Sequence, residues 1–310
     1  MTAVQLFDVS LRDGLQNEAV VVPTHQKLAI AQRLVDAGYT DIELTSFVRP
    51  RLVPQLADAS DVVAGLRGLH GADDVRFWAL VPNQIGLDRA VDSGIGHICT
   101  FMSASETHNQ KNVNRTIRES QAALERVIRS ASTQEIGTRA YISTVFGCPF
   151  EGDVAVGSTL GIGKALLDAG ADVIVLGDTT GMATPHQVKD VLAALVDGGI
   201  PLDRIGLHFH DTRGTAVVNA FAAWQFGARM FDGSTAGVGG CPYAPGATGN
   251  AASEDLVYLF DSIGDPSGVD LELACEAGRE LEDVLGRELP GRYHRYWLAE
   301  TGRAKCRTTA

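Results

Sequence analysis

A repeated junction of helix, glycine and strand organises the chain. A helical tail, a glycine and an apolar run rich in β-branched side chains follow one another in segments 34–47, 90–103, 166–179 and 224–237. The glycines are Gly38, Gly94, Gly170 and Gly227, and each can end a helix in the left-handed conformation. Because a strand follows each glycine at once, the pattern predicts the joints of a parallel sheet.

The other short apolar runs complete a set of eight predicted strands. These strands are 4–11, 40–47, 76–82, 97–103, 138–146, 172–179, 204–211 and 230–236. Helical patterns separate them: we expect Thr24 to cap a helix over 25–37, an amphipathic helix over 115–131, and Thr184 with Pro185 to open a helix over 185–198. This alternation of strand and helix predicts an α/β fold, a closed (β/α)8 or TIM barrel.

The length fits one domain over residues 1–310, since a TIM barrel takes about 250 residues. We expect the barrel core over about 4–250 and a helical C-terminal extension over about 251–302. Within the extension, 253–264 and 270–286 read as additional helices. The last residues, 303–310, are expected to form a mobile tail.

Composition and charge narrow the function classes. The chain is 45% hydrophobic and 21% charged, an ordinary balance for a protein with a sizeable core. We find no run of about 18 apolar residues and no basic segment leading into an apolar one at the start, so we expect neither a membrane span nor a signal peptide. The net charge of −12 argues against nucleic-acid or anionic-membrane binding.

The cysteines favour a cytoplasmic protein with reduced thiols. Cys99, Cys148, Cys241, Cys275 and Cys306 are widely spaced and form no CxxC pair. We expect Cys99, Cys148 and Cys275 to be buried and inert. Cys241 lies in GGCPYAPGATGN (239–250), whose glycines and prolines predict a loop that closes over a ligand and carries a thiol, with an inert thiol as the alternative.

The sharpest local feature is a pair of histidines in the seventh predicted strand, IGLHFHDT. Two residues apart, His208 and His210 share one face of the strand, and in a barrel the other face is covered by helices. Two core imidazoles either hydrogen-bond to each other or hold a metal. Asp13 and Asn250 fall at neighbouring strand ends, and this ligand set suits Mg²⁺ or Mn²⁺, with Zn²⁺ as a substitute. The other histidines are expected to be surface or structural residues: His25, His70, His97, His108, His186 and His294.

Two further charged residues lie where a barrel places its active site, at the ends of strands. Arg12 and Asp13 follow the first strand, and we expect Asp13 to bind the metal while Arg12 is free to neutralise a developing oxyanion. Glu43 is an inward carboxylate in the second strand, and Arg12 is its expected cationic neighbour. The alternatives are a rim salt bridge between Arg12 and Asp13 and a buried Arg12–Glu43 pair without a catalytic role.

Taken together, these segments resemble the 3-hydroxy-3-methylglutaryl-CoA lyase family, within the larger group of metal-dependent TIM-barrel lyases and synthases. The resemblance rests on LRDGLQNE (11–18), IELTSFVRPRLVPQLAD (42–58), SASETHNQKNVN (103–114), GCPFEG (147–152), LGDTTG (176–181), LHFHDTRG (207–214) and GGCPYAPGATGN (239–250). These motifs span most of the chain in order.

The resemblance implies a site and a reaction. Asp13, His208, His210 and Asn250 would be the metal ligands, Arg12 the catalytic arginine, Glu43 its neighbouring acid and Cys241 the thiol of the mobile loop. The implied reaction is the cleavage of a 3-hydroxyacyl-CoA to acetyl-CoA and a keto acid. His208 is the first choice of base and Asp13 the second. The family also implies an acyl-CoA substrate, a homodimer and a role in leucine degradation.

Departures from the family pattern put the acyl group in question. Val175 stands where we expect a small hydroxyl residue, the seventh strand continues as HDTRGTAVVN, and Arg49 and Arg51 make the loop after the second strand more basic. These arginines are expected either to bind CoA phosphates or to be solvated rim charges. The substrate candidates are Gln16, Arg49, Arg139, Tyr141, Asp178 and Thr179.

Three other functions remain as alternatives. A citramalyl-CoA-type lyase would use the same chemistry. A Claisen condensing synthase would run the carbon–carbon step in reverse, but such enzymes usually carry a long C-terminal regulatory domain. A barrel without catalysis, acting as a binding or scaffold protein, would not need the full set of polar residues at the strand ends.

Overall fold

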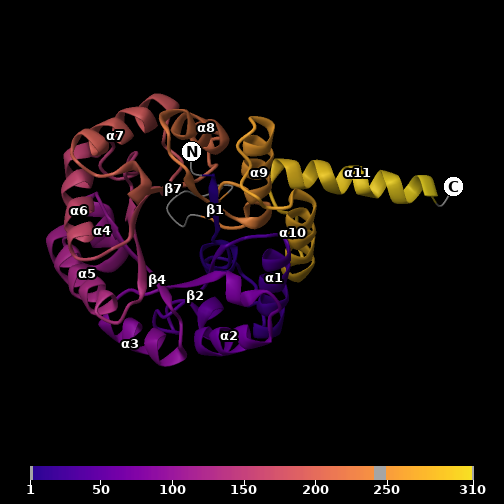
Figure 1. Ribbon diagram of the computed structural model, residues 1–310, viewed down its shortest axis with the longest axis horizontal. Coiled ribbons are helices and arrows are strands. Elements are labelled where there is room, and N and C mark those ends of the chain that lie inside the picture. Colours follow the sequence, from indigo (N-terminus) through magenta and orange to yellow (C-terminus); the bar gives the residue numbers. More distant parts are fainter. Residues whose placement is uncertain (1–2, 241–248, 309–310) are drawn as a thin grey trace.

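Eight parallel strands close into a barrel in the computed structural model, which describes residues 3–240 and 249–308 (Figure 1). The strands are β1 (Gln5–Asp8), β2 (Asp41–Ser46), β3 (Arg76–Leu80), β4 (His97–Ser103), β5 (Gly137–Ser143), β6 (Val173–Asp178), β7 (Ile205–Phe209) and β8 (Met230–Gly233). Each strand pairs with the next, and β8 pairs with β1 in register from Gln5↔Met230 to Asp8↔Gly233. The predicted TIM barrel and all eight predicted strands are confirmed.

Helices surround the barrel in the order that the sequence predicts (Figure 1). They are α1 (Thr24–Asp36), α2 (Ala59–Gly65), α3 (Gln84–Ser93), α4 (Glu106–Val113), α5 (Ile117–Ser132), α6 (Val156–Asp168), α7 (Pro185–Asp197) and α8 (Ala216–Phe226). The expected start of α7 is confirmed, because the Thr184 side chain accepts a hydrogen bond from the backbone N–H of Gln187. A capping box of Thr116 and Glu119 opens α5.

Two details at the helix ends test the sequence analysis. The four predicted glycines adopt left-handed conformations, with φ of 91° at Gly38, 86° at Gly94, 111° at Gly170 and 117° at Gly227. The predicted cap at Thr24 is wrong. Helix α1 begins at Thr24 itself, and the Thr24 hydroxyl donates to the Asp58 carboxylate at 2.7 Å instead of capping the helix.

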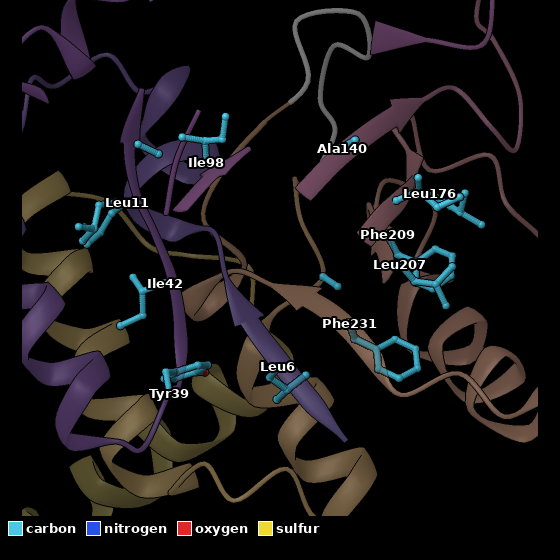
Figure 2. Packing of buried hydrophobic residues seen from close by; sticks show 14 of the residues in the cluster. Leu6, Leu11, Tyr39, Ile42, Ile98, Ala140, Leu176, Leu207, Phe209 and Phe231 are labelled. Atoms are coloured by element: carbon cyan, nitrogen blue, oxygen red, sulfur yellow. The ribbon is translucent and has the colours of Figure 1, made fainter. Parts of the chain in front are cut away.

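Strand residues alternate between the helices and the barrel interior. The outward residues include Ile42 and Phe231, which Figure 2 shows directed toward the surrounding helices. Their neighbours Glu43 and Asp232 therefore face inward, as do His208 and His210 beside outward Leu207 and Phe209. The barrel interior also holds a separate apolar cluster: Phe7, Val9, Trp78, Leu80, Cys99, Tyr141 and Val175. The alternation thus directs the predicted polar residues of the strands into the barrel interior.

The chain continues beyond the barrel in three helices: α9 (Ser253–Ser262), α10 (Leu271–Leu285) and α11 (Arg292–Thr308). The two predicted extension helices, 253–264 and 270–286, are confirmed as α9 and α10, and α10 packs on α1. Helix α11 extends away from the barrel (Figure 1) and includes the predicted tail as far as Thr308, whose mobility stays a prediction. None of the helices among the described residues is both long and apolar enough to cross a membrane.

Candidate active site and metal centre

A cavity opens at the C-terminal ends of the strands. Its walls include seven of the predicted site residues: Arg12, Asp13, Gln16, Tyr141, Thr179, His208 and His210. Arg12 and Asp13 lie on η1 (Ser10–Gly14), a short π-helical turn directly after β1. Such turns within a helix are often found at functional sites because they redirect side chains locally.

Asp13, His208 and His210 form a potential metal centre. One ligand atom from each lies within 4.8 Å of the other two. The two Nε2 atoms of the histidines are 3.1 Å apart, and Nε2 of His208 is 4.0 Å from Oδ2 of Asp13. Both histidines are buried, and their Nε2 atoms lie close together in the wall of the cavity.

Asn250 completes the predicted ligand set from the loop after β8. Its backbone pairs with His210, and its Nδ2 donates to the Val238 carbonyl at 3.2 Å. Its Oδ1 is buried and has no hydrogen-bond partner among the described residues. Glycine at 239 permits this placement, since a Cβ there would lie 2.7 Å from Asn250 Nδ2.

These residues fit a divalent cation. Two adjacent ligands of an octahedral ion, each about 2.1 Å from it, are separated by about 3 Å, which matches the spacing of the two Nε2 atoms. The orphaned Oδ1 of Asn250 is the kind of oxygen that such an ion satisfies. With a carboxylate, an amide oxygen and two imidazoles, the donor set is compatible with a divalent metal ion.

Arg12 lies between two carboxylates. Its Nε is 2.7 Å from Oε2 of Glu43, and its Nη1 donates to Oδ1 of Asp13 at 2.6 Å. The predicted Arg12–Glu43 contact is therefore present. We expected Arg12 to be free to neutralise an oxyanion, but here its side chain contacts both Asp13 and Glu43. Burial raises the pKa of Asp13, yet the charges of Arg12 and the histidines outweigh burial and hold this pKa well below its usual range.

Asp232 on β8 was not predicted as a site residue, and it contacts His208. Its Oδ2 is 3.1 Å from Nδ1 of His208 and accepts a hydrogen bond from the Tyr141 hydroxyl at 2.7 Å. Its Oδ1 accepts from Nη2 of Arg139 at 2.6 Å. Burial lowers the pKa of His208, but the hydrogen bond and charge of Asp232 outweigh this and raise it overall. Burial lowers the pKa of His210 to about 4, with a contribution from His208.

The substrate candidates separate into two groups. Gln16, Tyr141 and Thr179 line the cavity, and the Thr179 hydroxyl also accepts a hydrogen bond from a backbone N–H. Three others lie elsewhere: Arg139 below the cavity, Asp178 behind it and Arg49 on the exposed surface.

Asp178 supports a loop rather than lining the cavity. Its Oδ1 accepts hydrogen bonds from the backbone N–H groups of Met182 and Ala183, at 2.7 and 3.1 Å. Burial raises its pKa to about 6 despite these bonds. The observed contacts therefore place Asp178 in the support of the loop after β6.

The predicted thiol, Cys241, lies outside the described residues. Cys99, Cys148 and Cys275 are buried free thiols. Burial raises the pKa of Cys99 well above its usual value, which disfavours a nucleophilic thiolate there. The predicted burial of these three cysteines is thus confirmed, and their inertness stays a prediction.

Several cavity residues were not predicted. They are Asn17, Leu80, Phe101, His108, Asn112, Ser143, Gly177 and Gly240. His108 was expected to be a surface or structural residue, but it is buried and reaches the cavity from α4. The spacing of His108 and Asn112, four residues apart on one helix, was the available signal that both share a face.

Comparisons with known proteins agree with this architecture. The HMGL-like family model matches residues 3–281. The chain is 47% identical over 289 residues to hydroxymethylglutaryl-CoA lyase YngG of Bacillus subtilis, covering 93% of this chain and 95% of that protein. It is 43% identical over 297 residues to (R)-citramalyl-CoA lyase of Chloroflexus aurantiacus, covering 94% and 93%.

A solved structure with a bound ligand is also similar. It is an HMG-CoA lyase from Acinetobacter baumannii in complex with coenzyme A and 3-methylmalate. The two chains share 36% identity with a TM-score of 0.88, over 95% of this chain and 96% of the other. The chain therefore belongs to the HMGL-like family of enzymes.

Proposed function

We propose that this protein is a metal-dependent carbon–carbon lyase that cleaves 3-hydroxy-3-methylglutaryl-CoA to acetyl-CoA and acetoacetate. The observation that carries the proposal is the convergence of Asp13, His208 and His210 beside Arg12 in one cavity. The 47% identity to a hydroxymethylglutaryl-CoA lyase supports the substrate class.

The proposed metal ligands are Asp13, His208, His210 and Asn250. A bound Mg²⁺ or Mn²⁺ would lower the pKa of the substrate hydroxyl and hold a substrate carboxylate. The protein surrounds this position with buried side chains, so charges interact more strongly there than in water.

Cleavage breaks the C2–C3 bond of the 3-hydroxyacyl thioester. The hydroxyl proton passes to a protein base, the oxygen becomes the ketone oxygen of acetoacetate, and the electron pair of the broken bond forms a thioester enolate. We assign Arg12 to neutralise the enolate charge. A proton then returns to C2 and gives acetyl-CoA, and Cys241 is the proposed donor.

The hydrogen bond between His208 and Asp232 limits which residue can act as the base. Because Nδ1 of His208 faces Asp232, Nε2 is the atom left for the site, and it cannot bind a metal and accept a proton at once. We therefore propose His208 as a ligand and Asp13, our second choice, as the base. A carboxylate has two oxygens, so one oxygen of Asp13 would hold the metal while the other accepts the hydroxyl proton.

Citramalyl-CoA is the alternative substrate. The 43% identity to an (R)-citramalyl-CoA lyase is close to that of the hydroxymethylglutaryl-CoA lyase, so overall similarity does not choose between them. The Acinetobacter baumannii lyase binds coenzyme A, which supports an acyl-CoA substrate for either activity. We further propose a homodimer located in the cytoplasm that acts in leucine degradation.

An acetyl-CoA release assay tests the proposal. The protein is incubated with 3-hydroxy-3-methylglutaryl-CoA and with citramalyl-CoA, each with Mg²⁺, with Mn²⁺ and with a chelator. We expect release from the first substrate with either metal and none with the chelator. Release from citramalyl-CoA alone would reassign the substrate, and full release under chelation would disprove the metal requirement.

A further inference from the structure

We infer that Asp232 is a positioning residue that holds His208 with its proton on Nδ1 and its Nε2 directed at the metal position. Asp232 touches neither the proposed metal nor the cavity surface. It acts through the histidine, and its own orientation depends on Arg139 and Tyr141, which cross the barrel interior from β5.

Three donors fix the Asp232 carboxylate. Arg139 binds one oxygen at 2.6 Å, while the Tyr141 hydroxyl and Nδ1 of His208 meet the other at 2.7 and 3.1 Å. Arg139 is itself held by stacking, with its guanidinium carbon 3.8 Å from the centre of the Phe7 ring. All of these side chains are buried, which strengthens the charged contacts to the carboxylate.

This carboxylate selects one form of the histidine ring. A carboxylate flanked by an arginine is an acceptor, so the ring nitrogen facing it must carry the proton. The other nitrogen of a neutral ring, Nε2, then presents its lone pair 3.1 Å from Nε2 of His210. Second-shell carboxylates of this kind orient metal-bound histidines and make them better ligands.

The neighbouring His210 lacks such a support. Its Nδ1 is buried without a hydrogen-bond partner among the described residues. Within the proposed centre, His208 is therefore the ligand with a fixed tautomer. The inference rests on the metal centre of the proposed function, but it does not depend on the acyl-CoA substrate.

Metal binding without substrate tests the inference. Metal-free protein is titrated with Mn²⁺, and free Mn²⁺ is followed by its EPR signal. We expect Asp232→Asn to weaken Mn²⁺ binding about 10- to 100-fold. Asp41→Asn is the matched control: Asp41 is also a buried strand carboxylate bonded to an arginine and an aromatic N–H, but among the described residues it forms no hydrogen bond with His208 or His210. It should bind Mn²⁺ like the wild type.

A double variant separates positioning from stability. Asp232→Asn leaves the Arg139 charge buried without its partner, which destabilises the fold. Arg139→Gln combined with Asp232→Asn removes both charges and avoids that cost. If this folded double variant bound Mn²⁺ as tightly as the wild type, the inference would be wrong.

The ring itself can be observed in the wild-type protein. With ¹⁵N-labelled histidine and bound Mg²⁺, we expect an NMR signature of His208 with the proton on Nδ1, unchanged in Asp41→Asn. A proton on Nε2 would overturn the inference even if every Asp232 variant failed to fold. If instead this pattern held but no acyl-CoA were cleaved, the proposed lyase activity would fail while the positioning role stood.

Discussion

Both ends of the barrel carry a carboxylate beside an arginine, but the two ends differ in how completely the protein satisfies their buried polar groups. At the N-terminal end, the Asp41 carboxylate accepts hydrogen bonds from Thr40, Trp78 and twice from Arg76, at 2.6 to 3.0 Å. At the C-terminal end, Asp13 meets Arg12, while Asn250 Oδ1 lacks a partner among the described residues.

This difference shows how to distinguish a structural charge from a functional one. The Asp41 carboxylate already accepts four hydrogen bonds from the protein, so it has no acceptor position left for a ligand. The cluster at the C-terminal end contains an acceptor, Asn250 Oδ1, that the described residues leave unsatisfied, and leaving such a group buried costs stability. A bound ligand would satisfy this acceptor and remove the cost. Matched variants at the two ends of the barrel test this difference.

The largest effect is expected from Asp13→Asn, compared with Asp41→Asn. Loss of the Asp13 charge removes a proposed metal ligand, and metal stabilisation of several kcal/mol corresponds to a loss of about 10³-fold or more in turnover. Asp41→Asn should keep turnover within about twofold of the wild type. Steady-state acetyl-CoA release measures both, and equal losses in the two variants would erase the distinction between the ends.

Arg12→Gln should lower turnover by about 10²- to 10³-fold, because one oxyanion donor is lost. The matched control is Arg76→Gln, whose side chain is half-exposed and forms an ion pair with Asp41 at the N-terminal end of the barrel. We expect a normal rate for that control. The account of Arg12 fails if its variant retains full turnover at saturating substrate and metal.

Asp41→Asn, which should leave turnover nearly unchanged, should lower the free energy of unfolding. The substitution weakens a buried hydrogen bond from Trp78 to a charged acceptor, a kind of bond that typically contributes about 1.5–3 kcal/mol. It also weakens the hydrogen bond from half-exposed Arg76, whose contribution solvent reduces. Urea unfolding monitored by circular dichroism measures the change. An unchanged urea midpoint would show that the charge of Asp41 contributes nothing to the stability of the fold.

The smallest effect is expected for Arg49→Ala at the rim. Arg49 is exposed and lies outside the cavity, so a contact with CoA phosphate would be screened by solvent and contribute at most about 1 kcal/mol. We expect the KM for the acyl-CoA to rise by up to about fivefold at low salt, with kcat unchanged. A KM that does not respond to the substitution or to salt would identify Arg49 as a solvated charge.

The fold could be predicted well because its signals are local. A glycine such as Gly170 after a helical tail, followed by an apolar run, marks each joint, and repetition of that pattern defines the barrel. The Thr24 cap was wrong because the Asp58 carboxylate, 34 positions away in the chain, binds its hydroxyl. Such a tertiary contact has no signature in the local pattern.

The site could be predicted in part. Alternation along β7 placed His208 and His210 on one inner face, and Asp13 was expected near them because all strands of a barrel end at the same rim. Asp232 was missed because a single acid in MFDG resembles any strand-end residue. Its role appears only when β5 and β8 face each other across the barrel interior, which also explains why Arg139 lies below the cavity.

The most direct test of the central claim is to reconstitute metal-free protein with Mn²⁺ in substoichiometric steps. Bound metal and the rate of acetyl-CoA release from 3-hydroxy-3-methylglutaryl-CoA are measured at each step, with His210→Ala as a control. We predict that the rate rises in proportion to bound metal up to one ion per chain, and that His210→Ala neither binds tightly nor turns over. Full turnover by the metal-free protein would contradict the account.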